Sequence, residues 1–149
     1  MLSISNLTIG FGGSEAVISE ADCIIRDGER LLICGAAGMG KTTLLSAAAG
    51  IMPRLVSVAR YSGTVALDGR PLSDMTNGEI FKAIGFVSQN VEDQLWDLSV
   101  EDVIAFPMEN RCMSPTEIRR RLTQLIDKFA LAELCGRRVL TLSGGERRM

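Results

Sequence analysis

Residues 35–42 read GAAGMGKT, and they directly follow the short apolar run RLLIC of residues 30–34. The eight residues fit the G-x-x-x-x-G-K-[ST] pattern of phosphate-binding loops. The apolar run is typical of a strand buried on both faces of a parallel sheet, and residues 41–49 have the composition of a helix that ends at Gly50. A strand, a glycine-rich turn and a helix in this order predict a site for a nucleoside triphosphate.

The residue types of this loop explain the chemistry that the pattern predicts. The glycines Gly35, Gly38 and Gly40 allow successive backbone N–H groups to point at an anion, and the helix that follows adds the positive end of its dipole. We expect Lys41 to reach the β- and γ-phosphates and the Thr42 hydroxyl to bind Mg²⁺. The alternative is a glycine-rich turn without a ligand, which explains neither the Lys-Thr pair nor the preceding strand.

The composition is that of a single globular domain. The chain has 149 residues, of which 46% are hydrophobic and 23% charged, and its net charge is −2. This charge provides no basic field for nucleic acid, and the N-terminal sequence MLSIS lacks the features of a signal peptide. Histidine is absent and the four cysteines form no CxxC pair, so the sequence predicts reduced cysteines and no metal cluster.

Further strands are predicted on both sides of the loop. Residues 2–9 alternate apolar and polar side chains, residues 16–25 follow a glycine turn, and residues 63–67 precede an Asp-Gly turn. Residues 84–88 (IGFVS) form an apolar run that leads into Gln89. From about residue 91 the pattern becomes helical.

Helix starts are predicted from their capping residues. Thr76 and Glu79 have the spacing of a capping box. Ser114, Pro115 and Glu117 combine an N-cap, a proline at the first helical position and a capping glutamate. The helix that follows should present one apolar face, made of Ile118, Leu122, Leu125, Ile126 and Phe129.

Residues 142–146 read LSGGE, a second short motif. Alone it is weak, because Ser-x-x-Glu is also an ordinary capping box. However, Gln89 lies about midway between the two motifs, and the order of loop, glutamine and LSGG resembles the nucleotide-binding domain of the ABC ATPase family. The resemblance covers nearly the whole chain.

The resemblance implies the fold. It predicts an α/β P-loop NTPase domain of the ABC type, with a mixed sheet that has an antiparallel β part and with a helical subdomain. We expect a single domain over residues 1–149, incomplete at its C-terminus, with the loop core and antiparallel part in 1–90 and the helical subdomain in 91–149.

The resemblance also implies roles for individual residues. Phe11, after the first strand, would stack on adenine, and Gln89 would contact Mg²⁺ or the attacking water and face a membrane partner. Ser143 and Gly145 would contact the γ-phosphate bound by another subunit in a head-to-tail dimer. The implied nucleotide-binding residues are Phe11, Gly35, Gly38, Met39, Gly40, Lys41, Thr42, Thr43, Ser143, Gly144, Gly145 and Glu146, and the implied Mg²⁺ ligands are Thr42 and Gln89.

Several positions depart from the usual family pattern. Ala36, Ala37 and Met39 replace polar residues of the loop, and Met39 cannot donate a hydroxyl to phosphate. Since backbone N–H groups make the cradle, we expect binding to persist in a weaker form. Glu146 replaces the commoner glutamine, a change that we expect to be tolerated.

A finer resemblance lies between the two motifs. Residues 89–95 (QNVEDQL), 100–106 (VEDVIAF) and 108–110 (MEN) look like the ATPase subunits of energy-coupling-factor transporters, where the pattern is roughly QNPDDQL and VEEDVAFGPEN. Those systems import vitamins or cobalt and nickel ions. The resemblance implies ATP and Mg²⁺ as cofactors, a second ABC ATPase subunit (identical or paralogous), a transmembrane transporter subunit, and a cytoplasmic place on the inner face of the cell membrane, with no nucleic-acid partner.

In the family, the signature is followed by a strand with an Mg²⁺-binding aspartate and a catalytic glutamate (the Walker B region), and then by a switch histidine. These 149 residues contain none of them, so we expect the chain alone to bind ATP without hydrolysing it, and to need dimerisation, strand exchange or a missing complement to complete its sheet. Two alternatives stay open: a non-hydrolysing nucleotide-binding module, and a soluble ABC ATPase that acts on nucleic acid or the ribosome. The charge balance and the transporter-like stretch disfavour the second.

Overall fold

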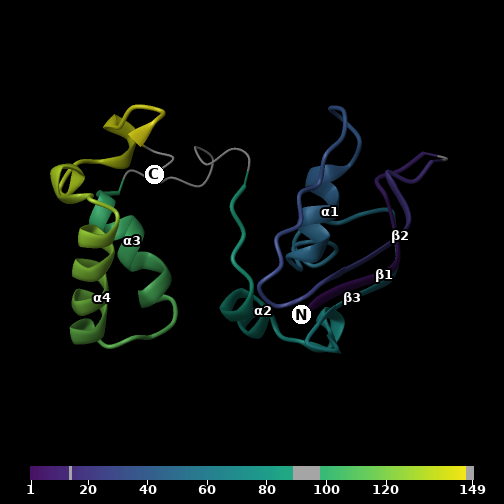
Figure 1. Ribbon diagram of the computed structural model, residues 1–149, viewed down its shortest axis with the longest axis horizontal. Helices are drawn as coiled ribbons and strands as arrows, with labels where there is room; N and C mark the ends of the chain where they lie inside the picture. Colours follow the sequence, from purple (N-terminus) through teal and green to yellow (C-terminus); the bar gives the residue numbers. More distant parts are fainter. Residues whose placement is uncertain (14, 89–97, 147–149) are drawn as a thin grey trace. The chain divides into compact units, whose positions relative to one another are not determined.

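The computed structural model describes residues 1–13, 15–88 and 98–146. The chain divides into two compact units, Met1–Phe86 and Val87–Met149. We predicted a single domain with parts 1–90 and 91–149, and that division stays a prediction. Figure 1 shows a β-sheet with α1 and α2 in the first unit and a pair of helices in the second. No helix among the described residues is long and apolar enough to cross a bilayer.

The first unit is built on a four-stranded antiparallel sheet with the order β2-β1-β3-β4. The strands are β1 (Leu2–Gly10), β2 (Ile18–Ile25), β3 (Arg60–Leu67) and β4 (Arg70–Pro71). The strands predicted around residues 2–9, 16–25 and 63–67 are therefore confirmed. Strand β1 lies between β2 and β3, and its Leu2 pairs with Ile25 on one side and with Leu67 on the other.

An irregularity in β1 brings two backbones into close contact. The register of β1 against β3 shifts between Ser5 and Thr8, where Asn6 has a φ of 49°. Opposite this shift lies Gly63 with a φ of 89°, and a Cβ atom there would stand 2.3 Å from the carbonyl oxygen of Asn6. Only glycine fits this position, because any side chain would overlap main-chain atoms.

The core of the first unit joins the sheet to the helices. Helix α1 (Lys41–Ala48) contributes Ala47, and the sheet contributes side chains from β1 and β3. The buried cluster consists of Ile4, Leu7, Ile9, Ala47, Val65, Leu72 and Ile80. Gly50, with a φ of 73°, follows the last turn of α1 and donates a hydrogen bond to the Ala47 carbonyl, as predicted for a helix that ends there.

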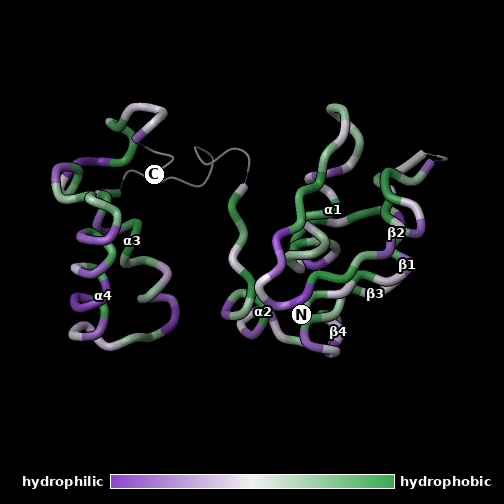
Figure 2. The backbone as a smooth tube through the Cα atoms, in the orientation of Figure 1, coloured by the Kyte–Doolittle hydropathy of each residue, from purple (hydrophilic) through white to green (hydrophobic). Residues whose placement is uncertain are grey.

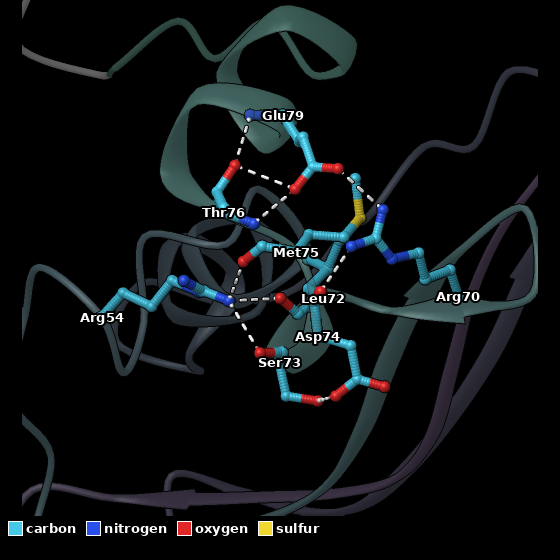
Figure 3. Close-up of polar contacts among 8 residues, drawn as sticks. All are labelled: Arg54, Arg70, Leu72, Ser73, Asp74, Met75, Thr76 and Glu79. Carbon is cyan, nitrogen blue, oxygen red and sulfur yellow. Dashed lines mark hydrogen bonds and ion pairs between the residues drawn. The ribbon is translucent and has the colours of Figure 1, made fainter.

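A polar network fixes the segment that leads from the sheet to α2 (Asn77–Ala83). This segment begins with the 3-10 turn η1 (Leu72–Asp74). The predicted capping box is confirmed, since the Glu79 N–H donates to the Thr76 hydroxyl and the Thr76 N–H donates to the Glu79 carboxylate. Arg70 pairs with Glu79 at 2.8 Å, and Arg54 donates to backbone carbonyls of the same segment, as Figure 3 shows.

The two predicted apolar strands at residues 30–34 and 84–88 are not present as strands. Both stretches run without regular structure, and the side chains of Leu32 and Val87 are 83% and 85% exposed. Figure 2 colours the stretch at residues 31–34 as hydrophobic nonetheless. A strand buried on both faces depends on neighbouring strands, and none of the four described strands pairs with either stretch.

The second unit consists of α3 (Val100–Glu109), α4 (Pro115–Lys128) and the 3-10 turns η3 (Ala132–Leu134) and η4 (Val139–Thr141). The part of the predicted helical region at residues 91–97 lies outside the described residues. The buried cluster of this unit is Val100, Leu134, Val139 and Leu142.

Helix α4 starts as predicted, with Ser114 as N-cap and Pro115 at its first position. The Ser114 hydroxyl accepts a hydrogen bond from the Glu117 N–H. The Glu117 carboxylate differs from the prediction, because it pairs with Arg120 at 2.6 Å and with Arg121 at 2.9 Å rather than capping the helix. The predicted apolar face is half-buried, except that Phe129 is exposed.

Candidate nucleotide-binding site

The predicted phosphate loop ends at Gly40, which is the N-cap of α1 and has a φ of 77°. A Cβ atom at Gly40 would lie 2.8 Å from the Val17 side chain and 2.9 Å from the Ile18 side chain. Glycine is therefore required here for two reasons, its left-handed backbone and its close approach to the start of β2. The contact fixes where the loop enters the helix.

The N-terminus of α1 is open to an anion. No side chain caps it, and the first turn of the helix contains no acidic residue. Residues 35–39, which precede it, are exposed. The unpaired N–H groups of a helix start and the positive end of its dipole favour a bound phosphate, so this arrangement fits the predicted ligand.

The Lys41 side chain folds back over this loop. Its Nζ donates hydrogen bonds to the carbonyl oxygens of Gly35 at 2.9 Å and of Ala36 at 2.6 Å. The ammonium group is therefore held over the same loop whose N–H groups would receive the phosphates. The lysine ammonium and the loop carbonyls therefore lie together, and the predicted contact of Lys41 with phosphate stays a prediction.

The remaining loop residues differ in exposure. Met39 is 67% exposed, Thr42 is exposed at the second position of α1, and Thr43 is half-buried. The accessible Thr42 hydroxyl fits the role of a single Mg²⁺ ligand. Within the described residues no group of three or more His, Cys, Asp or Glu side chains could hold a metal, so an ion here would depend mainly on the nucleotide phosphates.

Phe11 lies in the turn that follows β1, and 49% of its surface is exposed. The Val17 N–H donates to the Ile9 carbonyl at 2.8 Å and closes this turn. Since Val17 also contacts Gly40, one end of the Phe11 turn lies beside the phosphate loop. Gln89 lies outside the described residues.

The LSGGE motif forms a tight turn in the second unit. The Glu146 N–H donates to the Ser143 hydroxyl at 3.3 Å, and the Ser143 N–H donates to the Glu146 carboxylate at 2.7 Å. This is the geometry of a capping box, the alternative that the motif alone left open. Between these two residues Gly144 and Gly145 are exposed, and a Cβ atom on either would have no neighbour within 4 Å.

Arg137 precedes this turn and contacts it, an interaction that the sequence did not reveal. Its guanidinium donates to the Glu146 carboxylate at 3.1 Å and to the Thr141 carbonyl at 3.3 Å. Hydrogen bonds from Ser143 and then the Arg137 contact hold the pKa of Glu146 below its usual value. Arg137 and Glu146 are nine residues apart in irregular structure, where no helical or strand period relates them. The sequence therefore gives no sign of their contact.

The sequence profile of the ABC transporter family matches residues 18–149. The chain belongs to the ABC transporter family. Its fold agrees, since the ATP-binding cassette MJ0796, solved as a dimer with ADP and Pi, superposes with a TM-score of 0.78 at 24% identity, over 99% of this chain and 66% of that one. The predicted fold class, a P-loop NTPase domain of the ABC type in partial form, is therefore confirmed.

Two relatives of this chain are described as ATP-binding proteins. The cobalt import ATP-binding protein CbiO of Syntrophus aciditrophicus is 36% identical over 100% of this chain and 52% of its own length. A putative ABC transporter ATP-binding protein of Methanosarcina acetivorans is 32% identical over 99% of this chain and 23% of its own length. The chain thus spans between about a quarter and a half of the length of these two relatives.

A solved relative has a similar structure. It is cbiO1 from Clostridium perfringens, described as part of the ABC transporter complex cbiONQ. It superposes with a TM-score of 0.78 at 26% identity, over 99% of this chain and 57% of that one.

Proposed function

We propose that this chain is the ATP-binding part of a transport ATPase of the energy-coupling-factor type, which couples the binding and hydrolysis of ATP to solute import. The observation that carries this proposal is the open start of α1. A glycine N-cap, the absence of acid in the first turn, and a lysine ammonium held over the loop together make a cradle for polyphosphate.

Within this cradle each residue has a distinct task. The backbone N–H groups from Gly35 to Gly40 bind the phosphates, and Lys41 exchanges its carbonyl partners for the β- and γ-phosphates. Thr42 offers one oxygen to Mg²⁺, and the exposed ring of Phe11 stacks on adenine. Gln89 completes the set as the residue that senses Mg²⁺ or water.

The LSGGE turn acts on a nucleotide held by another subunit. Its exposed glycines allow close approach of a phosphate, and the Ser143 hydroxyl and the N–H groups of the turn are the donors. The partner is a second ABC ATPase subunit, either identical or paralogous. The dimeric form of the cassette MJ0796 supports this arrangement.

The relatives and the stretch between the two motifs support this type of transporter. The similarity to a cobalt import protein and to a subunit of the cbiONQ complex supports a place beside a transmembrane partner on the cytoplasmic face of the cell membrane. Nucleic acid is not an expected partner, given the net charge of −2. Turnover by the 149 residues alone is expected to be negligible, because none of the assigned residues is a general base.

Thermal unfolding with and without Mg²⁺-ATP tests the binding site. A ligand at 100 times its Kd stabilises the folded state by about 2.7 kcal/mol. Lys41→Ala should remove most of this shift, while Lys82→Ala, which removes the same charge from an exposed position in α2, should keep it. AMP should give no shift, because it lacks the β- and γ-phosphates. An undiminished ATP shift in Lys41→Ala would refute the assignment.

A further inference from the structure

Both carboxylate oxygens of Glu146 are engaged. One accepts the Ser143 N–H at 2.7 Å, and the other accepts the Arg137 guanidinium at 3.1 Å. The Glu146 side chain is 29% exposed and the Arg137 side chain 42%. The carboxylate of the LSGGE turn therefore has a fixed orientation and a paired charge.

The backbone of Arg137 is itself anchored to the first turn of α3. Its carbonyl oxygen accepts the Val100 N–H at 3.1 Å, and the N–H of the preceding Gly136 donates to the Glu101 carboxylate at 2.6 Å. The second guanidinium nitrogen binds the Thr141 carbonyl, just before the LSGGE motif. Arg137 thus connects helix α3, Thr141 and Glu146.

The surroundings of Glu146 favour such a partner. Glu146 lies at a pocket of about 260 Å³ whose other lining residues are all apolar, among them Val100, Val139 and Leu142. Apolar side chains beside a carboxylate remove part of its hydration, which favours a nearby counter-charge. Arg137 supplies this charge from within the same unit.

The charge of Glu146 also matters to a ligand. The LSGG turn is expected to receive a phosphate, which is anionic, and an unpaired carboxylate next to it would repel that group. The glutamine that is commoner at this position in the family carries no charge, so it poses no such problem. A glutamate here is compatible with phosphate only if a neighbouring cation balances it.

We propose that Arg137 is a positioning residue of the LSGGE turn, which neutralises and orients Glu146 so that Ser143, Gly144 and Gly145 can receive a phosphate. The inference rests on the proposed role of this turn in binding the γ-phosphate of a second subunit. Its effect is on recognition rather than on folding, because a half-exposed ion pair contributes little to stability.

The first test measures the Arg137–Glu146 pair directly. The carboxyl carbon of Glu146 is titrated by NMR in the wild-type chain, in Arg137→Met and in Arg137→Lys. Loss of the guanidinium should raise the pH at which Glu146 titrates and shift the Ser143 amide resonance, and lysine should restore much of the wild-type behaviour. An unchanged titration in Arg137→Met would overturn the inference and leave the proposed function standing.

The second test measures recognition. Association driven by Mg²⁺-ATP is followed by analytical ultracentrifugation of the protein with its partner subunit. Arg137→Met should weaken this association about tenfold or more, and the double variant Arg137→Met/Glu146→Gln should return to within about threefold of Glu146→Gln alone.

The two failures are distinguishable. A double variant as weak as Arg137→Met would show that arginine acts only as a structural support, which would overturn the inference. A wild-type protein that does not associate with Mg²⁺-ATP would instead contradict the proposed function of the turn, while the NMR titration still decides whether Arg137 controls Glu146.

Discussion

The guanidinium of Arg54 donates a hydrogen bond of 2.6 Å to the carbonyl oxygen of Met75, across 21 residues of sequence. The same nitrogen contacts the carbonyls of Leu72 and Ser73 (Figure 3), and the other binds the Asn77 side chain at 3.1 Å. A single side chain thereby ties the loop after α1 to the segment that starts α2.

Removal of this side chain should destabilise the first unit. Arg54→Ala leaves several carbonyls without their charged donor, and we expect a loss of about 1–3 kcal/mol in the free energy of unfolding. Arg54→Lys should recover only part of it, because a lysine lacks the planar fork that reaches several acceptors. Urea unfolding is the measurement, with the exposed Arg60→Ala as control. A loss no larger than that of the control would contradict the prediction.

Gly63 and Gly78 should respond to alanine in opposite ways. At Gly63 the new Cβ would stand 2.3 Å from the Asn6 carbonyl in a backbone with φ of 89°, so we expect a loss of more than about 3 kcal/mol or failure to fold. At Gly78, within α2, nothing lies within 4 Å, so alanine should be neutral or stabilise by up to about 1 kcal/mol. Similar thermal shifts for the two variants would contradict the close approach at Gly63.

The Glu79 carboxylate should contribute to stability in a way that depends on pH. The Thr76 backbone N–H, then Arg70 and the Thr76 hydroxyl, lower the pKa of Glu79 to about 2. A depressed pKa in the folded state gives a stabilisation that is complete above the unfolded value of 4.5 and is lost as the pH falls from there to about 2.

Glu79→Gln isolates this charge, because glutamine can keep the capping box while it loses the carboxylate. The wild type should have the higher urea midpoint at pH 7, and the difference should shrink below pH 4.5 and vanish near pH 2. Glu15→Gln, at an exposed position, controls for the change in net charge. A difference that stays constant over this range would refute the assignment.

The apolar residues that lie outside regular structure should cause self-association. Leu32 and Val87 are 83% and 85% exposed, and the backbone around them pairs with none of the described strands. Such segments are templates for pairing with another chain. The particle size of the 149-residue chain in light scattering should rise with concentration, and less so in Leu32→Ser.

The control for this variant is Leu55→Ser, which replaces a leucine that is 59% exposed in the loop after α1. It should associate as the wild type does, since the expected contact runs through residues 30–34. If both substitutions reduced the self-association equally, the cause would be surface hydrophobicity in general rather than pairing of residues 30–34.

The sequence predictions succeeded where the signal depends on residues close together in the chain. The capping box of Thr76 and Glu79, the Ser114-Pro115 start of α4 and the glycine end of α1 depend on residues within one turn, and each is confirmed. The antiparallel strands also match, because alternation of apolar side chains is a property of the strand itself.

Features that depend on residues far apart in the sequence were not predicted correctly or were missed. An apolar run such as residues 30–34 becomes a buried strand only if neighbours pair with it, and those neighbours cannot be read from the run itself. The Arg54 network and the Arg137–Glu146 pair also escaped prediction, because turns bring their members together without a sequence period. In the candidate site, the motif predicted that Lys41 reaches the phosphates, which stays a prediction, whereas its contacts with two carbonyls came from the structure.

Those carbonyl contacts have a consequence for the kinetics of nucleotide capture. Under the proposed function, Gly35 and Ala36 would compete with the phosphates for the Lys41 ammonium, and an arriving triphosphate would displace two hydrogen bonds before it gained its own. The Lys41 ammonium already lies at the loop, and its two hydrogen bonds preorganise residues 35 and 36. Under the proposed function, capture would then require the Lys41 side-chain end to move away from these two carbonyls.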